Sequence, residues 1–304
     1  MGWTRRAAIG GMAAALAGGA QAMDRPDAEP FTFELQNRVF QQRRMPFLAV
    51  YGGARPRLGF VAALHAVDPA SATFKLVDTG FERVAPRRLI LEGFTHDWGD
   101  NPRQIAALAA RRTDPQADAF TRSESVFAAA RALERGVPFR GGELGEPDLV
   151  DRLAASGFAR QDLLNVMLIK VLDQDHNGGV FTKPEGPAFE AAFDRWAGIL
   201  SSTHGAPAPS VAQFQTWYQD RFGTALADDP DWRRRAWPGQ PGLGGRIAQA
   251  QGLERDRFLL ARIREAAASD PSVLVVYGGS HLASLWTALS ADFGPPEIIG
   301  PEAA

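Results

Sequence analysis

Residues 273–281, with the sequence VLVVYGGSH, decide the fold class. The first five residues form a short apolar run that stops at a glycine pair, which is typical of a buried strand. The apolar segment behind His281, residues 282–289, predicts a helix. A strand that leads into a helix is typical of an α/β protein with a parallel sheet, and His281 stands where the chain leaves that sheet.

Strands and helices are predicted to alternate along the rest of the chain. Apolar runs at 47–51 and 59–64 flank a cluster of Gly, Arg and Pro, which predicts an N-terminal β-hairpin. Similar runs at 89–91 and 137–139 predict two more buried strands. Helical patterns lie between the strands, at residues 105–112, 123–135, 149–155, 161–172 and 255–268. The sequence therefore predicts an α/β fold with a mainly parallel sheet.

One long stretch departs from this alternation. From about residue 147 to residue 250 there is no convincing strand, and four of the seven tryptophans of the chain fall here. We interpret it as a helical insertion that caps the sheet and borders the substrate. No fixed period recurs along the sequence, so we expect one domain, residues 23–304, that carries this insertion.

The composition excludes several classes of protein. The chain has 304 residues, of which 45% are hydrophobic and 22% charged, as in globular proteins. A formal charge of -2 gives no basic field that would attract nucleic acid. The chain contains no cysteine, so disulfides, thiolate metal sites and cysteine nucleophiles are excluded. A metal ion would have to be bound by His, Asp or Glu.

Residues 1–22 resemble an export signal. Arg5 and Arg6 precede a run of mostly Ala and Gly, and Ala20-Gln21-Ala22 provides the small residues that a signal peptidase requires. The adjacent arginines favour the twin-arginine pathway over an ordinary Sec signal. We therefore expect a periplasmic or secreted protein. No later segment is long and apolar enough to span a membrane, so no membrane span is expected in the mature chain.

Three chemically active side chains stand at predicted strand ends. His65 follows the second strand of the hairpin, Glu92 follows the apolar run 89–91, and His281 follows the run at 273–277. Carboxyl ends of parallel strands meet at one edge of a sheet, where a crevice opens. Two imidazoles and one carboxylate with open coordination positions are typical of a hydrolytic metal site.

The order of motifs resembles a known family. A hairpin that ends in His65 is followed by Leu-Ile-Leu-Glu92, by an Arg-Gly-Val-Pro segment that leads to Glu143, by Glu-Arg255-Asp, and by Gly-x-x-His281. This order resembles the Tiki/TraB/GumN family, whose clan includes the erythromycin esterases and the ChaN-type haem-binding lipoproteins. The resemblance covers residues 44–145 and 252–290 and leaves the helical middle unmatched.

The resemblance implies a divalent-metal hydrolase. It makes His65, Glu92 and His281 the metal ligands, with Glu143 and Arg255 as further site residues. Manganese or cobalt is implied, and mixed nitrogen and oxygen ligands also suit zinc. Glu143 would be the general base and Arg255 would neutralise the oxyanion of a peptide or small ester substrate. The sequence departs from the family where Ala62 replaces the glycine of the first Gly-x-x-His motif.

Other interpretations stay open. In the esterase branch of the clan no metal is needed, and His65 would be the base, oriented by Glu92 or Glu143. In the haem-binding branch, His65 or His281 would be an axial ligand. Glu143 is also compatible with a solvated turn, and Arg255 with an ordinary exposed helix position. The natural substrate and the oligomeric state are not indicated by the sequence.

The remaining histidines and one acidic cluster are predicted to be structural. His96 and His204 fall in loop-like contexts and are expected to face solvent. Asp173, Asp175 and Asn177 match the first oxygen ligands of an EF-hand loop, but Pro184 stands where the bidentate Glu belongs. We therefore favour a polar turn at a helix end over a calcium site.

Overall fold

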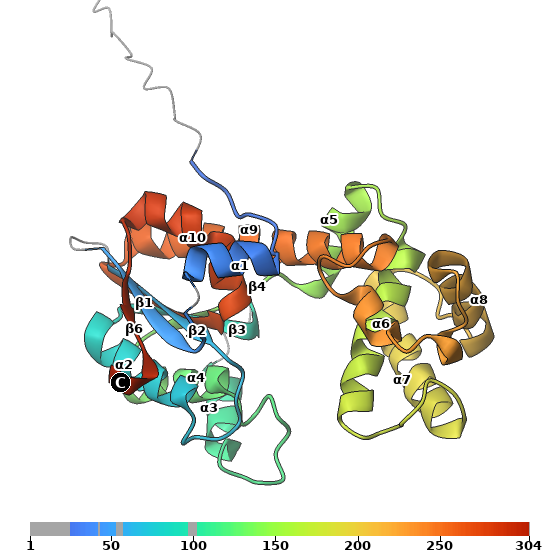
Figure 1. Ribbon diagram of the computed structural model, residues 1–304. Coiled ribbons are helices and arrows are strands. Elements are labelled where there is room, and N and C mark those ends of the chain that lie inside the picture. Colours follow the sequence, from blue (N-terminus) through green and yellow to red (C-terminus); the bar gives the residue numbers. More distant parts are fainter. Residues whose placement is uncertain (1–24, 42, 53–56, 97–101, 304) are drawn as a thin grey trace, which may run out of the picture.

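The computed structural model describes residues 25–41, 43–52, 57–96 and 102–303. The predicted export signal, residues 1–22, lies outside the described residues. Within these ranges the chain forms a sheet covered by helices on both faces and a second, purely helical lobe (Figure 1). No helix in this part of the chain combines the length and the apolar character that a membrane crossing requires.

The sheet has six strands in the order β4-β3-β5-β2-β1-β6. Their bounds are β1 Phe47–Tyr51, β2 Arg57–Ala63, β3 Arg88–Thr95, β4 Phe139–Glu143, β5 Ser272–Gly278 and β6 Glu297–Ile299. The central strand β5 pairs in parallel with β2 and β3, and β3 pairs in parallel with β4. Strand β1 is antiparallel to β2 and β6, so β1 and β2 form the predicted hairpin. The carboxyl ends of four parallel strands therefore lie at one edge.

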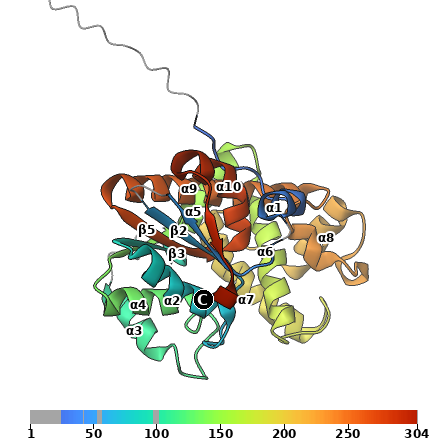
Figure 2. The same cartoon turned by 60° about the vertical axis from the view of Figure 1, so that its left-hand side comes forward.

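Alternate residues of the strands build two cores. Val273, Val275 and Tyr277 pack on the face covered by α1 (Phe33–Phe40), α9 (Leu243–Ser269) and α10 (Gly279–Phe293). Leu274 and Val276 pack on the opposite face, under α2 (Ala72–Val84), α3 (Pro102–Arg111) and α4 (Glu124–Glu134). Figure 2 shows the strands between these two layers of helices. Burial on both faces explains why β5 is apolar at nearly every position.

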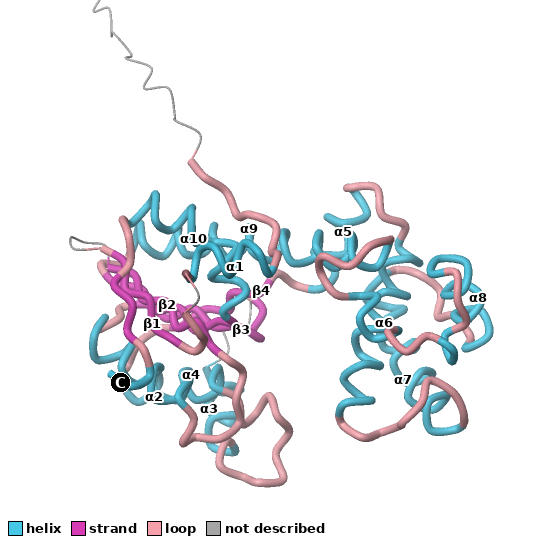
Figure 3. Tube along the Cα trace, viewed as in Figure 1, coloured by secondary structure: helices cyan, strands magenta, loops and turns pink. Residues whose placement is uncertain are grey.

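The predicted insertion forms the second lobe. It contains α5 (Glu146–Ala155), α6 (Arg160–Asn177), α7 (Pro187–His204), α8 (Val211–Phe222) and short 3₁₀ turns at 226–228 and 232–236. Figure 3 shows helices and loops but no strand in it. Its own core includes Phe189, Phe193, Phe214 and Tyr218. Helix α9 runs from this lobe to the sheet (Figure 1), so the lobe lies beside the sheet.

The predicted fold class is confirmed, and the structure corrects some element bounds. Strand β3 extends to Thr95, so Glu92 lies inside it, not after its end. Five residues of β3, from Leu91 to Thr95, lie opposite three residues of β4, from Gly141 to Glu143, and Gly93 has φ +79. Glu92 lies within this irregularity, and bulges of this kind are common beside functional sites. Strand β4 begins at Phe139, because Pro138 before it has no N–H to donate.

The EF-hand-like cluster lies on a helix. Asp173, Asp175 and Asn177 lie within the last five residues of α6, which ends five residues beyond the predicted position. Their side chains are used in local contacts: Asn177 donates to Asp173, and Trp196 Nε1 donates to Asp175 at 2.7 Å. The oxygens therefore do not converge on one point as the ligands of a calcium loop do.

Candidate functional site

The carboxyl edge of the sheet brings the three predicted metal ligands together. His65 follows β2, Glu92 lies in the irregular part of β3, and His281 is in the first turn of α10, directly after β5. His65 Nε2 is 4.0 Å from Glu92 Oε2, and His281 Nε2 is 3.5 Å from Glu92 Oε1. His65 and His281, which are more than 200 positions apart in the sequence, thus both face the carboxylate of Glu92.

Glu92 is fixed by a backbone donor. The Gly278 N–H donates to Glu92 Oε2 at 2.5 Å. A Cβ on Gly278 would lie 3.3 Å from this oxygen and 3.4 Å from His65 Nε2, so glycine leaves the space between them free. Burial works to raise the pKa of Glu92, but the neighbouring His281, Arg255 and His65 outweigh it and lower the pKa to about 2. The group is a carboxylate throughout the physiological pH range.

His281 is held by a buried carboxylate. Asp256 of α9, which is 2% exposed, accepts a hydrogen bond from His281 Nδ1 at 2.5 Å. Burial works to lower the pKa of His281, but the charge of Asp256 and its hydrogen bond outweigh it and raise the pKa to about 9. The ring also packs edge-to-face on Tyr277 at 5.1 Å. Its orientation is therefore set on two sides.

His65 repeats this arrangement at the surface. Its side chain is 67% exposed, and Nδ1 donates to Glu124 Oε1 at 2.6 Å. The other Glu124 oxygen accepts from the Ala66 N–H at 3.2 Å, so both oxygens of this buried acid are used. The hydrogen bond to Glu124 raises the pKa of His65. His65 is therefore the most exposed side chain of the three predicted ligands.

Arg255 and Glu143 form a bidentate pair. Arg255 Nε donates to Glu143 Oε2 at 2.9 Å, and Nη2 donates to Glu143 Oε1 at 2.6 Å. Arg255 Nη2 also lies 3.6 Å from Glu92 Oε1, so the guanidinium reaches the cluster. Burial works to lower the pKa of Arg255, but Glu143 outweighs it and keeps the pKa above its usual value. Arg255 and Glu143 therefore lie in the site, and each holds the other in place.

Two residues of this arrangement were missed in the sequence. Glu124 is the first residue of α4 and Asp256 lies within α9, where acids usually face solvent or stabilise the helix. No local pattern separates them from ordinary helix residues. One prediction is also wrong: His204, the last residue of α7, is fully buried, and its Nδ1 lies 3.0 Å from the Leu200 carbonyl oxygen. His96 is exposed, as expected.

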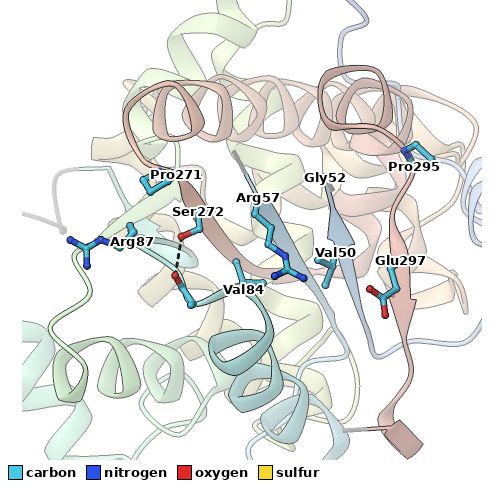
Figure 4. A pocket seen from close by; sticks show the side chains of 10 residues that line it. Val50, Gly52, Arg57, Val84, Arg87, Pro271, Ser272, Pro295 and Glu297 are labelled. Atoms are coloured by element: carbon cyan, nitrogen blue, oxygen red, sulfur yellow. Dashed lines mark hydrogen bonds between the residues drawn. The ribbon is translucent and has the colours of Figure 1, made fainter. Parts of the chain in front are cut away.

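A cavity of about 760 Å³ lies at the opposite edge of the sheet. Its walls include Arg57 and Ser272, which begin β2 and β5, and Glu297 of β6 (Figure 4). Figure 4 shows Arg57 reaching into it and Ser272 hydrogen-bonded to the Ala85 carbonyl. None of the five predicted site residues lines this cavity. Because chemistry in open α/β sheets gathers at the carboxyl edge, we place the candidate site there.

The cluster can be tested for its fit to a metal ion. Across the described ranges, no three His, Asp or Glu side chains are gathered closely enough to hold an ion as they stand. Donors that share one ion at about 2.1 Å lie roughly 3.0–3.5 Å apart. The separation of His281 and Glu92 meets this value, and that of His65 and Glu92 exceeds it by about half an ångström. The His65 ring would therefore have to move for the three side chains to share one ion.

The hydrogen bonds show where the protons of the two imidazoles lie. A carboxylate only accepts, so Nδ1 of each imidazole carries the proton, and Nε2 of a neutral ring presents a lone pair. Both Nε2 atoms face the oxygens of Glu92. Lone pairs that face each other repel unless a proton or a cation lies between them. At neutral pH the pKa of His281, raised to about 9, keeps a second proton on this ring, and that proton lies toward Glu92; a divalent cation would have to displace it.

No protein-family model, curated protein or solved structure matches the chain. The resemblance to the Tiki/TraB/GumN family thus depends on the motifs themselves and stays a prediction.

Proposed function

We propose that this protein is a divalent-metal hydrolase of peptide or ester bonds, with His65, Glu92 and His281 as the metal ligands. One observation carries the proposal: two imidazole Nε2 atoms face a single carboxylate, while each Nδ1 is held by a buried acid. Metal-binding histidines usually donate their second N–H to a carboxylate, which orients the ring and increases its basicity. Manganese, cobalt or zinc suits such ligands.

A bound divalent ion would polarise the substrate carbonyl and lower the pKa of a bound water. Arg255 supplies a permanent positive charge, with its Nη2 3.6 Å from Glu92 Oε1. Its guanidinium neutralises the negative charge that develops on the carbonyl oxygen during attack. Glu143, at the same edge, fixes the direction of the guanidinium by accepting two of its hydrogen bonds, and the sequence also proposes it as the general base.

A metal-independent hydrolase is the second candidate. The raised pKa of His281, about 9, keeps a proton on this ring at neutral pH, and a metal ion has to displace that proton to bind. The His65–Glu124 pair also has the form of a base and its orienting acid, with the ring 67% exposed. In this version His65 removes a proton from water, and Glu124 stabilises the imidazolium that results.

Metal analysis with an activity assay separates the two candidates. The purified protein, loaded in turn with Mn²⁺, Co²⁺ or Zn²⁺, is assayed on generic peptide and ester substrates before and after treatment with a chelator. Stoichiometric metal and chelator-sensitive turnover support the first proposal, and turnover that survives complete metal removal supports the second. Absence of turnover under all conditions contradicts both.

Substitutions locate the activity in the cluster. His281→Ala is expected to lose both metal and turnover, whereas His96→Ala, which removes an exposed histidine outside the cluster, is expected to retain both. Full metal occupancy in His281→Ala would remove His281 from the ligand set. The haem-binding alternative stays a prediction, tested by a Soret band on addition of haem that is lost in His65→Ala or His281→Ala.

A further inference from the structure

A second cavity, of about 550 Å³, lies between the sheet and the helical lobe. Its walls come from α1 and the segment before it, from α5, α6, α9 and α10, and from the loop that follows the 3₁₀ turn at 232–236. This volume lies in the range of small-molecule sites. Arg255, Asp256 and His281 form part of the wall, so the cavity adjoins the candidate site.

Large apolar side chains line this interlobe cavity. Phe31, Phe33, Met167 and Trp237 belong to its wall. Phe33 is 63% exposed and Trp237 is 42% exposed, although aromatic rings of this size are usually covered. Exposed apolar groups that gather at one concave place mark a binding surface for an apolar ligand.

The interlobe cavity also contains a cation without an anionic partner. Lys170 of α6 donates from Nζ to Gln251 Oε1 of α9. In the described part of the chain, no carboxylate lies within ion-pair distance of Nζ. Asp256 is the single acid among the described residues of the wall, and His281 already occupies one of its oxygens.

The surroundings of Lys170 favour an anion. Burial, and then the charge of Arg255, lower the pKa of Lys170 to about 8. A buried charge is costly unless a charge of opposite sign or several hydrogen bonds compensate it. Lys170 is one of only three lysines in the chain, and the other two, Lys75 and Lys183, are exposed.

We propose that the interlobe cavity binds an apolar molecule that ends in a carboxylate. Lys170 pairs with the carboxylate, and Phe33 and Trp237 cover the apolar part. Peptides with a hydrophobic C-terminal residue and medium-chain fatty acids share this chemistry. Because the wall includes His281 and Arg255, the ligand is part of a substrate or product; this step rests on the proposed function, whereas the binding itself does not.

Calorimetric titration of the full chain at pH 7 tests the proposal. The probes are N-acetyl-phenylalanine and decanoate, each compared with its uncharged primary amide. We expect at least one acid to bind about tenfold or more tightly than its amide, since a hydrogen bond to a charged group contributes about 1.5–3 kcal/mol. Tighter binding of N-acetyl-phenylalanine than of its amide identifies a peptide C-terminus as the ligand. Tighter binding of decanoate than of its amide identifies a fatty acid.

Matched variants assign the binding to the cavity. Lys170→Met is expected to abolish the preference for the acid, and Lys183→Met, which removes an exposed lysine, is expected to keep it. Because Lys170→Met changes a partly buried position, the melting temperature of this variant is compared with that of the natural protein. Phe33→Ala alters only an exposed ring and is expected to weaken binding of both acid and amide by about fivefold or more.

Three outcomes would overturn the inference: neither acid binds, acid and amide bind equally, or a folded Lys170→Met retains the preference. The outcomes also separate it from the proposed function. Selective binding without any turnover supports the cavity and contradicts the hydrolase. Turnover whose KM is the same for substrates that end in a carboxylate and in an amide contradicts the cavity as a substrate site.

Discussion

Gly278 lies at the centre of the candidate site, between Glu92 and His65. Its N–H binds Glu92, and the place of its missing Cβ faces both Glu92 and His65. The backbone at this position, with φ -54 and ψ 139, is open to any residue, so glycine is not needed for the chain to turn. The absence of a side chain is what leaves room for a cation or a reacting group.

Gly278→Ala is therefore expected to fold normally and to lose activity. The added methyl group would lie 3.3 Å from Glu92 Oε2, so this carboxylate has to shift by a few tenths of an ångström, and 3.4 Å from His65 Nε2, at van der Waals contact. Because small displacements of catalytic groups are costly, we expect kcat/KM to fall about tenfold or more. Gly198→Ala, at an exposed position of α7, is the control. Equal kcat/KM in natural protein and Gly278→Ala would exclude this space from the reaction.

Glu124→Gln tests whether the buried acid orients His65. Both Glu124 oxygens accept hydrogen bonds, and a glutamine has to turn its NH₂ group toward one of the two donors. Loss of such an outer carboxylate typically reduces metal affinity or activity about 10–100-fold, and we expect a loss of that size. Glu134→Gln, on the exposed end of the same helix, is the matched control and should change neither. A fully active Glu124→Gln would make Glu124 merely structural.

A double-mutant cycle decides what Glu143 does. Its oxygens both bind Arg255, so Glu143→Gln and Arg255→Lys each destroy the bidentate pair. If Glu143 acts through Arg255, each variant loses about tenfold or more in kcat/KM, and the double variant loses no more than either one. If the loss of kcat/KM in the double variant instead equals the product of the two single losses, Glu143 acts independently of Arg255, as a general base would.

At the scale of elements, the buried segments were the predictable part. Strand β5 and the β1–β2 hairpin are apolar runs bounded by glycine, and they form where the sequence places them. The bounds of β3 were not predictable, because its irregularity depends on pairing with β4, more than 40 residues later. The sequence predicts His65, Glu92 and His281 as site residues because each follows an apolar run. It does not predict Glu124 and Asp256, because neither follows such a run. Their roles arise only when α4 and α9 pack on the sheet.

One contact between elements of the helical lobe predicts a pH dependence. Asp229, 3% exposed, accepts hydrogen bonds from the Tyr218 hydroxyl at 2.7 Å and from Arg235 Nε at 2.8 Å. Burial works to raise the pKa of Asp229, but Arg235 and Tyr218 outweigh it and lower the pKa below its usual value. Because the pKa is lower in the native state, ionised Asp229 stabilises the fold at every pH above the pKa of an unfolded Asp, which is about 3.9. This stabilisation is lost as the pH falls through the native pKa.

Asp229→Asn is thus expected to lower the free energy of unfolding at pH 7 by about 1.5–3 kcal/mol. The difference from the natural protein should shrink as the pH falls below about 4, because protonation removes the same charge from the natural protein. Urea unfolding at a series of pH values from 7 to 3 measures this difference. A difference that does not depend on pH would mean that the ionised form of Asp229 has no special role.

At the scale of the whole molecule, α9 is the element shared by two lobes. Its first part places Ile247 in the core of the helical lobe, and its later part places Leu259, Leu260 and Ile263 in the core of the sheet. Gly252 lies between these parts, and a Cβ there would meet nothing within 4 Å. The helix also carries Arg255 and Asp256, so the site depends on its continuity.

Gly252→Pro is expected to uncouple the lobes. Proline removes a helix hydrogen bond and clashes with the preceding turn, at a cost of about 3 kcal/mol or more. Since each lobe has its own core, calorimetry should resolve two unfolding transitions in the variant, where an intact α9 couples them. Gly252→Ala is the matched control: it fits the available space and should raise stability by about 0.5–1 kcal/mol. If Gly252→Pro instead unfolds in one transition at lower temperature, the lobes are joined by more than α9, and the interlobe cavity is correspondingly rigid.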